Sequence, residues 1–237
     1  MTTSTSKESS LRFLKQTIDL AKNSPPKPTN FRVGCVIVAY GGPNSPQILS
    51  TGYTLELEGN THAEQCALRK LASDHSIPED DVGSLLSGEL NVVLYTSLEP
   101  CGKRLSGNLA CVQRIINTRK QNPEGGIRKV VFGAKEPGTF VQDSQSCKLL
   151  TEAGIEWEYL PDLEQDILTV AMEGHAKDEK VKDTSEKTKQ TAMSADAGQP
   201  SMGAGSAPQE HASAEGQPRN PKKRMMEAPP GSEESRS

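Results

Sequence analysis

Apolar residues near the N-terminus recur every three or four positions, a spacing that predicts an amphipathic helix. This helix is expected to begin after a capping serine, Ser9 or Ser10, and to end before Pro25. Residues 1–8, which precede the pattern, are expected to be disordered. The positions expected to face the core are Leu11, Leu14, Ile18 and Ala21.

Runs of apolar and β-branched residues predict the strands. The run at 33–40 predicts a buried strand, and the glycines and proline at 41–43 turn the chain toward a second strand at 47–53. These two strands are expected to form a hairpin. Further strands are predicted at 91–97, 127–134 and 155–159.

Helical spacings fill most of the chain between the strands, whereas residues 74–89 are polar and contain glycine, which predicts a loop. Strands that alternate with helices after an initial hairpin indicate an α/β fold, with a mixed and largely buried sheet and helices on both faces. The later helices are predicted at 62–72, 109–118, 145–153 and 163–173.

Composition changes sharply after residue 175. All nine aromatic residues precede residue 160, and residues 176–237 contain no aromatic residue, no Leu and no Ile. Such a segment cannot bury enough apolar surface to offset the entropy of its chain. We therefore expect one folded domain at 9–175 and a disordered, low-complexity tail at 176–237.

Charge narrows the class of partner. The tail holds ten basic and ten acidic residues, so the remainder of the chain has 17 basic and 21 acidic residues and is mildly acidic. A broad nucleic-acid-binding face needs an excess of basic residues, so small substrates are favoured over nucleic acid.

No apolar run is long enough for a membrane helix, and the N-terminus lacks the apolar core of a secretory signal. A cytoplasmic protein that does not bind membranes is expected. The basic cluster at 221–224 is of the kind seen in nuclear import signals, but four residues match such signals poorly.

The chain contains five cysteines, an odd number without an export signal, which argues for free thiols or metal ligands rather than disulfides. Cys35, Cys66 and Cys147 fall within predicted elements and are interpreted as small buried side chains. Cys66 also stays open as an alternative metal ligand, because it lies four residues after His62 on the same predicted helix.

Three other residues predict a catalytic zinc site. His62 begins the second helix, Cys101 follows the third strand, and Cys111 opens the next helix. Zn²⁺ accepts imidazole and thiolate together, and three protein ligands leave a fourth position for water, which the metal activates near neutral pH. Glu64, two residues beyond His62, is the predicted proton shuttle between that water and the substrate. A His-x-Glu triplet followed by Pro-Cys and a second Cys is the signature of zinc deaminases.

The motifs at 30–38, 62–64 and 97–101 resemble those of the cytidine-deaminase-like superfamily, and more closely those of the riboflavin-pathway deaminases. The resemblance covers roughly residues 11 to 172. Nine residues separate Cys101 from Cys111, where the common form has two, and residues 104–109 look like the fungal enzymes that act on a ribitylamino substrate.

The resemblance implies a three-layer α/β/α sandwich around a five-stranded mixed sheet, and a zinc-dependent hydrolase. The implied reaction is deamination of 2,5-diamino-6-ribitylamino-4(3H)-pyrimidinone 5′-phosphate at C2, which gives 5-amino-6-ribitylaminouracil 5′-phosphate and ammonia. The implied partner is thus a small pyrimidine phosphate, and no redox cofactor is needed. Members of the family often form dimers, so a homodimer is expected.

Substrate-binding residues are expected in the long loop between the two cysteines, where cations and hydrogen-bond donors suit a phosphate. Asn30 matches the family's substrate-binding asparagine, although a turn-capping role is also open. Glu136 matches an acidic residue that faces the site in relatives. The loop residues are Lys103, Arg104, Ser106 and Asn108.

Two alternatives remain at this point. A deoxycytidylate deaminase or a transfer-RNA adenosine deaminase would share the zinc chemistry, but the latter predicts a basic channel for a flipped base. A catalytically silent zinc-stabilised interaction module would have no use for the carboxylate of Glu64 at an open coordination position.

Overall fold

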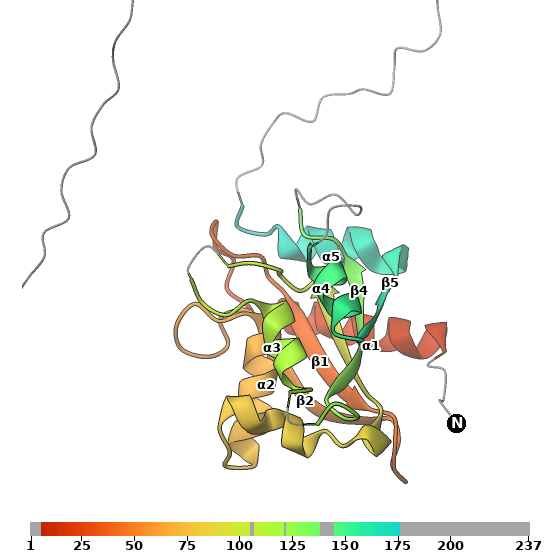
Figure 1. The fold of residues 1–237 in the computed structure, drawn as a ribbon. Coiled ribbons are helices and arrows are strands. Elements are labelled where there is room, and N and C mark those ends of the chain that lie inside the picture. The colour runs from red at the N-terminus through yellow and green to blue at the C-terminus, as the bar shows by residue number, and fades with distance from the viewer. Residues whose placement is uncertain (1–5, 105–106, 121, 138–144, 176–237) are drawn as a thin grey trace, which may run out of the picture. The chain divides into compact units, whose positions relative to one another are not determined.

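The computed structural model of the protein describes residues 6–104, 107–120, 122–137 and 145–175 (Figure 1). The predicted tail at 176–237, with its basic cluster at 221–224, lies outside the described residues. Among those that are described, no helix is both long enough and apolar enough to cross a membrane.

A five-stranded sheet forms the centre of the described domain, with the order β2-β1-β3-β4-β5. Strand β1 pairs antiparallel with β2 and β3, whereas β3, β4 and β5 run parallel. The predicted hairpin and the predicted mixed sheet are both confirmed. The strands are β1 (Gly34–Ala39), β2 (Gln47–Tyr53), β3 (Val92–Leu98), β4 (Ile127–Ala134) and β5 (Glu156–Tyr159).

Helices cover both faces of the sheet, which confirms the three-layer α/β/α sandwich (Figure 1). Alternate residues of each strand point to opposite faces, so Ile37 and Leu94 pack with α2, α3 and α4 while Val36 and Tyr95 pack with α1. Helix α5 joins α1 on that second face. The helices are α1 (Lys7–Ala21), α2 (Ala63–Asp74), α3 (Cys111–Asn117), α4 (Gln145–Glu152) and α5 (Glu164–Ala171).

The start of α1 differs from the prediction. The Ser9 N–H donates a hydrogen bond of 3.2 Å to the Ser6 hydroxyl, so Ser6 is the capping residue and the helix begins at Lys7. The predicted cap at Ser9 or Ser10 is therefore wrong, and residues 7 and 8 belong to the helix rather than to a disordered segment. Buried Ser10 lies inside the helix.

The predicted loop at 74–89 is also more ordered than expected. It contains the 3₁₀ helix η1 (Glu79–Leu85), and a second one, η2 (Gly88–Leu90), follows directly. Val82 and Leu86 are buried in the core beneath α2, which supplies the packing that holds this segment. Its four apolar residues, Ile77, Val82, Leu85 and Leu86, were too few among polar residues and glycines to predict a helix.

Candidate active site

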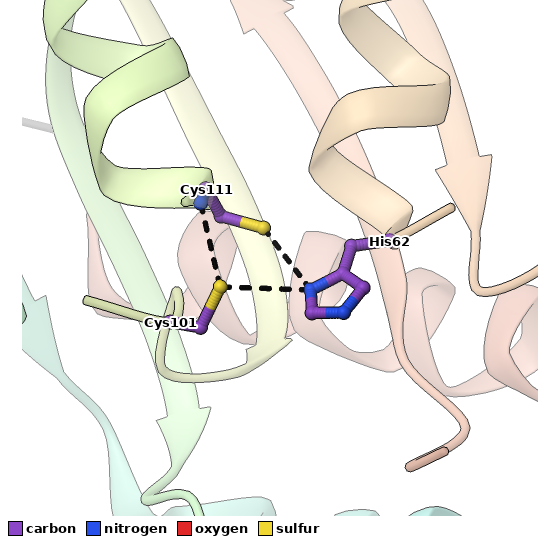
Figure 2. Close-up of side chains that lie close together, drawn as sticks. All are labelled: His62, Cys101 and Cys111. Atoms are coloured by element: carbon purple, nitrogen blue, oxygen red, sulfur yellow. Dashed lines mark hydrogen bonds between the residues drawn. The ribbon is translucent and has the colours of Figure 1, made fainter. Parts of the chain in front are cut away.

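Three elements bring His62, Cys101 and Cys111 together at one end of the sheet (Figure 2). His62 is the N-cap residue of α2 and has an extended backbone, so its imidazole is held at the helix start. Cys101 lies three residues after β3 ends at Leu98, and Cys111 is the first residue of α3. Although nine residues separate the two cysteines, both sulfurs lie beside the same imidazole.

The donor atoms are spaced as a tetrahedral metal requires. His62 Nδ1 lies 3.6 Å from the Cys101 sulfur and 3.3 Å from the Cys111 sulfur, and all three donor atoms lie within 4.8 Å of one another. In a tetrahedral zinc site, bond lengths of about 2.0–2.3 Å put neighbouring donor atoms about 3.5–3.8 Å apart. One imidazole and two thiols thus fit a zinc ion, with one coordination position left over.

The surroundings of the two thiols favour metal binding. The backbone N–H of Cys111 donates a hydrogen bond of 3.4 Å to the Cys101 sulfur. Hydrogen bonding from Cys111 holds the pKa of the Cys101 thiol well below its ordinary value, while the same interaction and burial raise the pKa of Cys111. The lowered pKa of Cys101 favours the thiolate form, which is the form that binds a metal ion.

Glu64 lies in the first turn of α2, is only 3% exposed, and lines the same cavity as His62 and Cys101. The hydroxyl of Thr96, on β3, donates a hydrogen bond of 3.2 Å to Glu64 Oε1. Burial raises the pKa of the Glu64 carboxyl, and the nearby Cys101 thiolate raises it further. A buried carboxyl that holds a proton this readily suits a general acid and base.

A cavity of about 260 Å³ opens beside these residues. The chain segment before β1 provides one wall, with Asn30 and Phe31, and Asn60 stands next to them. The Asn30 side-chain amide donates a hydrogen bond of 2.8 Å to Asn60 Oδ1, which holds Asn30 at the cavity. Asn30 is thus where the sequence predicted it.

The long cysteine loop provides cationic residues to the cavity. Lys103 is exposed and lines it. Arg104 also lines it but is buried, and its guanidinium donates hydrogen bonds of 3.0 Å to Gln65 Oε1 and 2.6 Å to the Asn60 carbonyl. Arg104 therefore ties the loop to α2 and to Asn60, and Lys103 is the more accessible cation.

Glu136 lines the cavity from the segment after β4, as the sequence predicted. It is partly buried, and burial raises the pKa of its carboxyl above the ordinary value; the Cys101 thiolate contributes to the same rise. Glu136 thus adds a second carboxyl to the cavity.

Three residues that the sequence suggested for the site are not placed there by the described part of the structure. Ser106 lies outside the described residues. Asn108 is exposed and does not belong to the cavity lining as described, so its substrate role stays a prediction. Cys66 is buried on α2 beside β2, and the metal cluster found among the described residues does not include it. The alternative ligand set with Cys66 is therefore not supported.

A buried ion pair behind Cys101 was missed by the sequence analysis. Glu99 Oε2 lies 3.1 Å from Lys135 Nζ, and both side chains are less than a tenth exposed. The Ser146 hydroxyl donates to the Glu99 carboxylate, and the Glu99 N–H donates to the Ala134 carbonyl at 2.9 Å. These contacts tie the Cys101 loop to β4 and α4. The charges of Glu99 and Lys135 were visible in the sequence, but 36 positions separate them.

Comparison with known proteins agrees with this site. The family model described as "Cytidine and deoxycytidylate deaminase zinc-binding region" matches residues 7–134, so the chain belongs to that family of zinc-binding deaminases. The matched span includes His62, Glu64, Cys101 and Cys111.

Two individual relatives, one of them in two crystal structures, are similar to this chain. The Rib2 deaminase of Aspergillus oryzae, crystallised as a C-terminal deletion mutant at pH 4.6, is 50% identical, with a TM-score of 0.64, over 70% of this chain and 92% of that one. The same mutant in complex with DARIPP matches with the same identity and TM-score, over 70% of this chain and 91% of that one. The diaminohydroxyphosphoribosylamino-pyrimidine deaminase of Schizosaccharomyces pombe is 34% identical over 163 residues, 69% of this chain but 35% of that protein. The chain thus spans about a third of the length of that curated relative.

Proposed function

We propose that this protein is a zinc-dependent hydrolase that removes the C2 amino group of 2,5-diamino-6-ribitylamino-4(3H)-pyrimidinone 5′-phosphate. The observation that carries the proposal is the 50% identity to the Rib2 deaminase of Aspergillus oryzae over nearly all of that chain. The pyrimidine-deaminase name of the Schizosaccharomyces pombe relative supports the same substrate class. The proposed partner is then a small phosphorylated pyrimidine rather than a nucleic acid. The proposed compartment is the cytoplasm, and the proposed assembly is a homodimer.

In this proposal His62, Cys101 and Cys111 hold the zinc ion. Bound there, the ion would supply Lewis-acid activation of a water molecule near neutral pH. The cluster offers one imidazole and two thiols, and two of its members, His62 and Cys101, line the cavity that Glu64 also lines. A metal with this ligand set is catalytic in type, because a structural zinc site would use a fourth protein ligand.

Glu64 moves the protons of the reaction. Its carboxylate takes a proton from the attacking water and delivers it to the ring nitrogen next to C2. It then takes the remaining proton from the new C2 hydroxyl and gives it to the departing amino group. Water supplies the oxygen of the new C2 carbonyl, and ammonia leaves with the nitrogen. The hydrogen bond from Thr96 to Oε1 helps to hold the Glu64 carboxylate in place at the cavity.

Lys103 is the proposed contact for the substrate phosphate, because it lines the cavity and is exposed. Arg104 supports that wall of the cavity through its bonds to Gln65 and Asn60. Asn30 and Glu136 offer an amide and a carboxyl to the polar edges of the pyrimidine.

Ammonia release from a panel of substrates tests the proposal. Purified protein loaded with zinc is offered the ribitylamino-pyrimidinone phosphate, its ribosylamino counterpart, cytidine and deoxycytidylate. Turnover of the ribitylamino compound alone is expected. Turnover of cytidine or deoxycytidylate instead would support the zinc-dependent deamination but contradict the proposed substrate. No turnover with zinc bound would favour a catalytically silent interaction module.

The phosphate contact has its own test. Lys103→Met is expected to raise KM for the phosphorylated substrate roughly tenfold and to leave KM for the dephosphorylated compound nearly unchanged, because one charge-assisted contact is lost. Lys120→Met, which removes an exposed lysine that does not line the cavity, is the control. An equal effect of Lys103→Met on both compounds would contradict the assignment.

A further inference from the structure

The cavity wall at 29–33 belongs to no helix or strand except for an isolated bridge between Lys27 and Asn30. It nevertheless carries Asn30 and Phe31 into the cavity. A segment without its own ladder of hydrogen bonds must be held by its neighbours. Asn30 is bonded to Asn60 and Val33 to Thr54, and further contacts come from the far end of the described chain.

The last residue of α5 and the turn that follows it contact this wall and the residues just before it. The Arg32 N–H donates a hydrogen bond of 3.1 Å to the Ala171 carbonyl, and the buried guanidinium of Arg32 forms an ion pair with Glu173. Gly174 has a φ of +93°, and a Cβ atom there would lie 2.7 Å from the Lys27 nitrogen. Only glycine fits both the left-handed backbone and the close approach.

His175 completes the contact. Its ring stacks on Phe31 with centroids 4.8 Å apart and planes 17° apart, and its Nε2 lies 3.2 Å from the Asn30 carbonyl. One side chain thus touches two of the residues, Asn30 and Phe31, that the wall presents to the cavity. Stacking fixes the plane of the Phe31 ring, and the hydrogen bond fixes the backbone of Asn30.

We propose that His175 is a positioning residue for substrate binding, which holds Phe31 and Asn30 in the wall that receives the pyrimidine ring. His175 acts through these two residues and does not itself line the cavity. The effect on substrate rests on the proposed function, whereas the effect on the wall does not. The turn after α5 therefore belongs to the substrate site, although some 110 residues separate it from the zinc ligand His62.

Hydrogen exchange tests the structural half without any substrate. In His175→Ala, the amides of residues 29–32 are expected to exchange at least several-fold faster than in the unchanged protein, while those of α2 keep their rates. His75→Ala, which removes another histidine at the end of α2, is the matched control and should leave residues 29–32 unchanged. Unchanged exchange at 29–32 in folded His175→Ala would overturn the proposal.

Kinetics tests the functional half. His175→Ala is expected to raise KM for the ribitylamino-pyrimidinone phosphate roughly tenfold, with kcat and zinc content nearly unchanged, because only the substrate wall is loosened. His175→Phe keeps the stacking and should recover much of the KM. If His175→Ala lowered kcat with KM unchanged, the proposal that His175 positions the substrate-binding wall would be wrong.

The two proposals can fail separately. If the unchanged protein does not turn over this substrate, the proposed function fails, and the exchange experiment still decides whether His175 holds the wall. If His175→Ala does not fold, Glu173→Gln serves in its place, since it loosens the same turn through Arg32 from an exposed position.

Discussion

The two cysteine sulfurs at the site are not equivalent. The Cys111 backbone N–H and thiol both stabilise the Cys101 thiolate, so Cys101 is ionised first. Cys111 is fully buried, and its interaction with Cys101 together with burial raises the pKa of its thiol. Because cysteine binds metal as the thiolate, metal binding at this site is expected to release protons, and the metal affinity should increase with pH.

Replacing Cys111 tests its assignment as a metal ligand. Cys111→Ser is expected to bind substoichiometric zinc after dialysis against a mild chelator, as measured by plasma mass spectrometry, because a serine hydroxyl does not ionise near neutral pH. Cys66→Ala, a buried thiol on the same helix as His62, should keep a full equivalent of zinc. Loss of zinc in Cys66→Ala with retention in Cys111→Ser would reverse the ligand set.

The raised pKa of Glu136 leads to a stability prediction with a definite sign. Because the native pKa lies above the unfolded value, ionising this carboxyl costs more in the folded chain than in the unfolded one. The cost is absent below about pH 4, where the carboxyl is protonated in both states, and it is complete once the pH exceeds the native pKa. Glu136→Gln removes it.

Thermal unfolding of metal-free protein measures this effect. Glu136→Gln is expected to unfold at a higher temperature than the unchanged protein at pH 8, and the difference should vanish as the pH falls to about 4. Glu124→Gln, which changes an exposed acidic residue in the turn before β4, is the control. A difference that grows on acidification would contradict the environment assigned to Glu136.

At the scale of elements, the position of α2 depends on close packing against β2. The Ser50 hydroxyl donates a hydrogen bond of 2.8 Å to the Ala67 carbonyl. Gly52 lies so near the helix that a Cβ atom there would be 2.3 Å from the Ala63 carbonyl oxygen and 2.6 Å from the Ala67 nitrogen. Ala63 follows His62 directly, so this contact sets where the imidazole lies.

Gly52→Ala is accordingly expected to push α2 away from the sheet. We expect a loss of about 1–3 kcal/mol in the free energy of unfolding, measured by urea titration, together with weaker zinc retention. Thr51→Ala, at the neighbouring position on the opposite face of β2, should change zinc retention little. A Gly52→Ala variant that kept both stability and zinc would show that α2 is positioned by other contacts.

The elements were largely predictable because their signals are local. The apolar β-branched runs predicted β1 and β2 nearly to the residue, and alternation along each strand gives the two faces of the sandwich. The start of α1 and the 3₁₀ helices η1 and η2 were missed, because a serine cap at Ser6 and the packing of Val82 against α2 are set by contacts rather than by periodicity.

The site shows the same division at longer range. A sequence motif predicted the site residues, because its residue types and their order are typical of a zinc-dependent deaminase. These residues are His62, Glu64, Cys101 and Cys111. The ion pair of Glu99 with Lys135 was not found, because such pairs depend on which loops the sheet brings together. Likewise, the sequence could not show that Arg104 is already engaged by Asn60.

At the scale of the whole molecule, the last described residues of the domain pack against a segment near its start. The turn after α5 packs on the wall before β1, so a chain that ends at His175 keeps every contact of the described site.

Truncation tests that boundary. A chain ending at His175 is expected to keep the kcat, KM and unfolding temperature of the full chain within experimental error, since the removed composition cannot form a core. A chain ending at Ala171 should lose substrate affinity, because the contacts of Glu173, Gly174 and His175 with the cavity wall are removed. Loss of activity in the longer truncation product would show that residues after 175 complete the site.

In the proposed reaction, this site adds water to C2 and expels ammonia, with Glu64 as the proton carrier. The most direct measurement is turnover of the ribitylamino-pyrimidinone phosphate in ¹⁸O-labelled water, with mass analysis of the product and parallel ammonia determination. One ¹⁸O atom per product and one ammonia per turnover are predicted, with a rate at least about 10²-fold lower in Glu64→Gln at equal zinc content. Product without ¹⁸O, or an undiminished rate in Glu64→Gln, would contradict the mechanism.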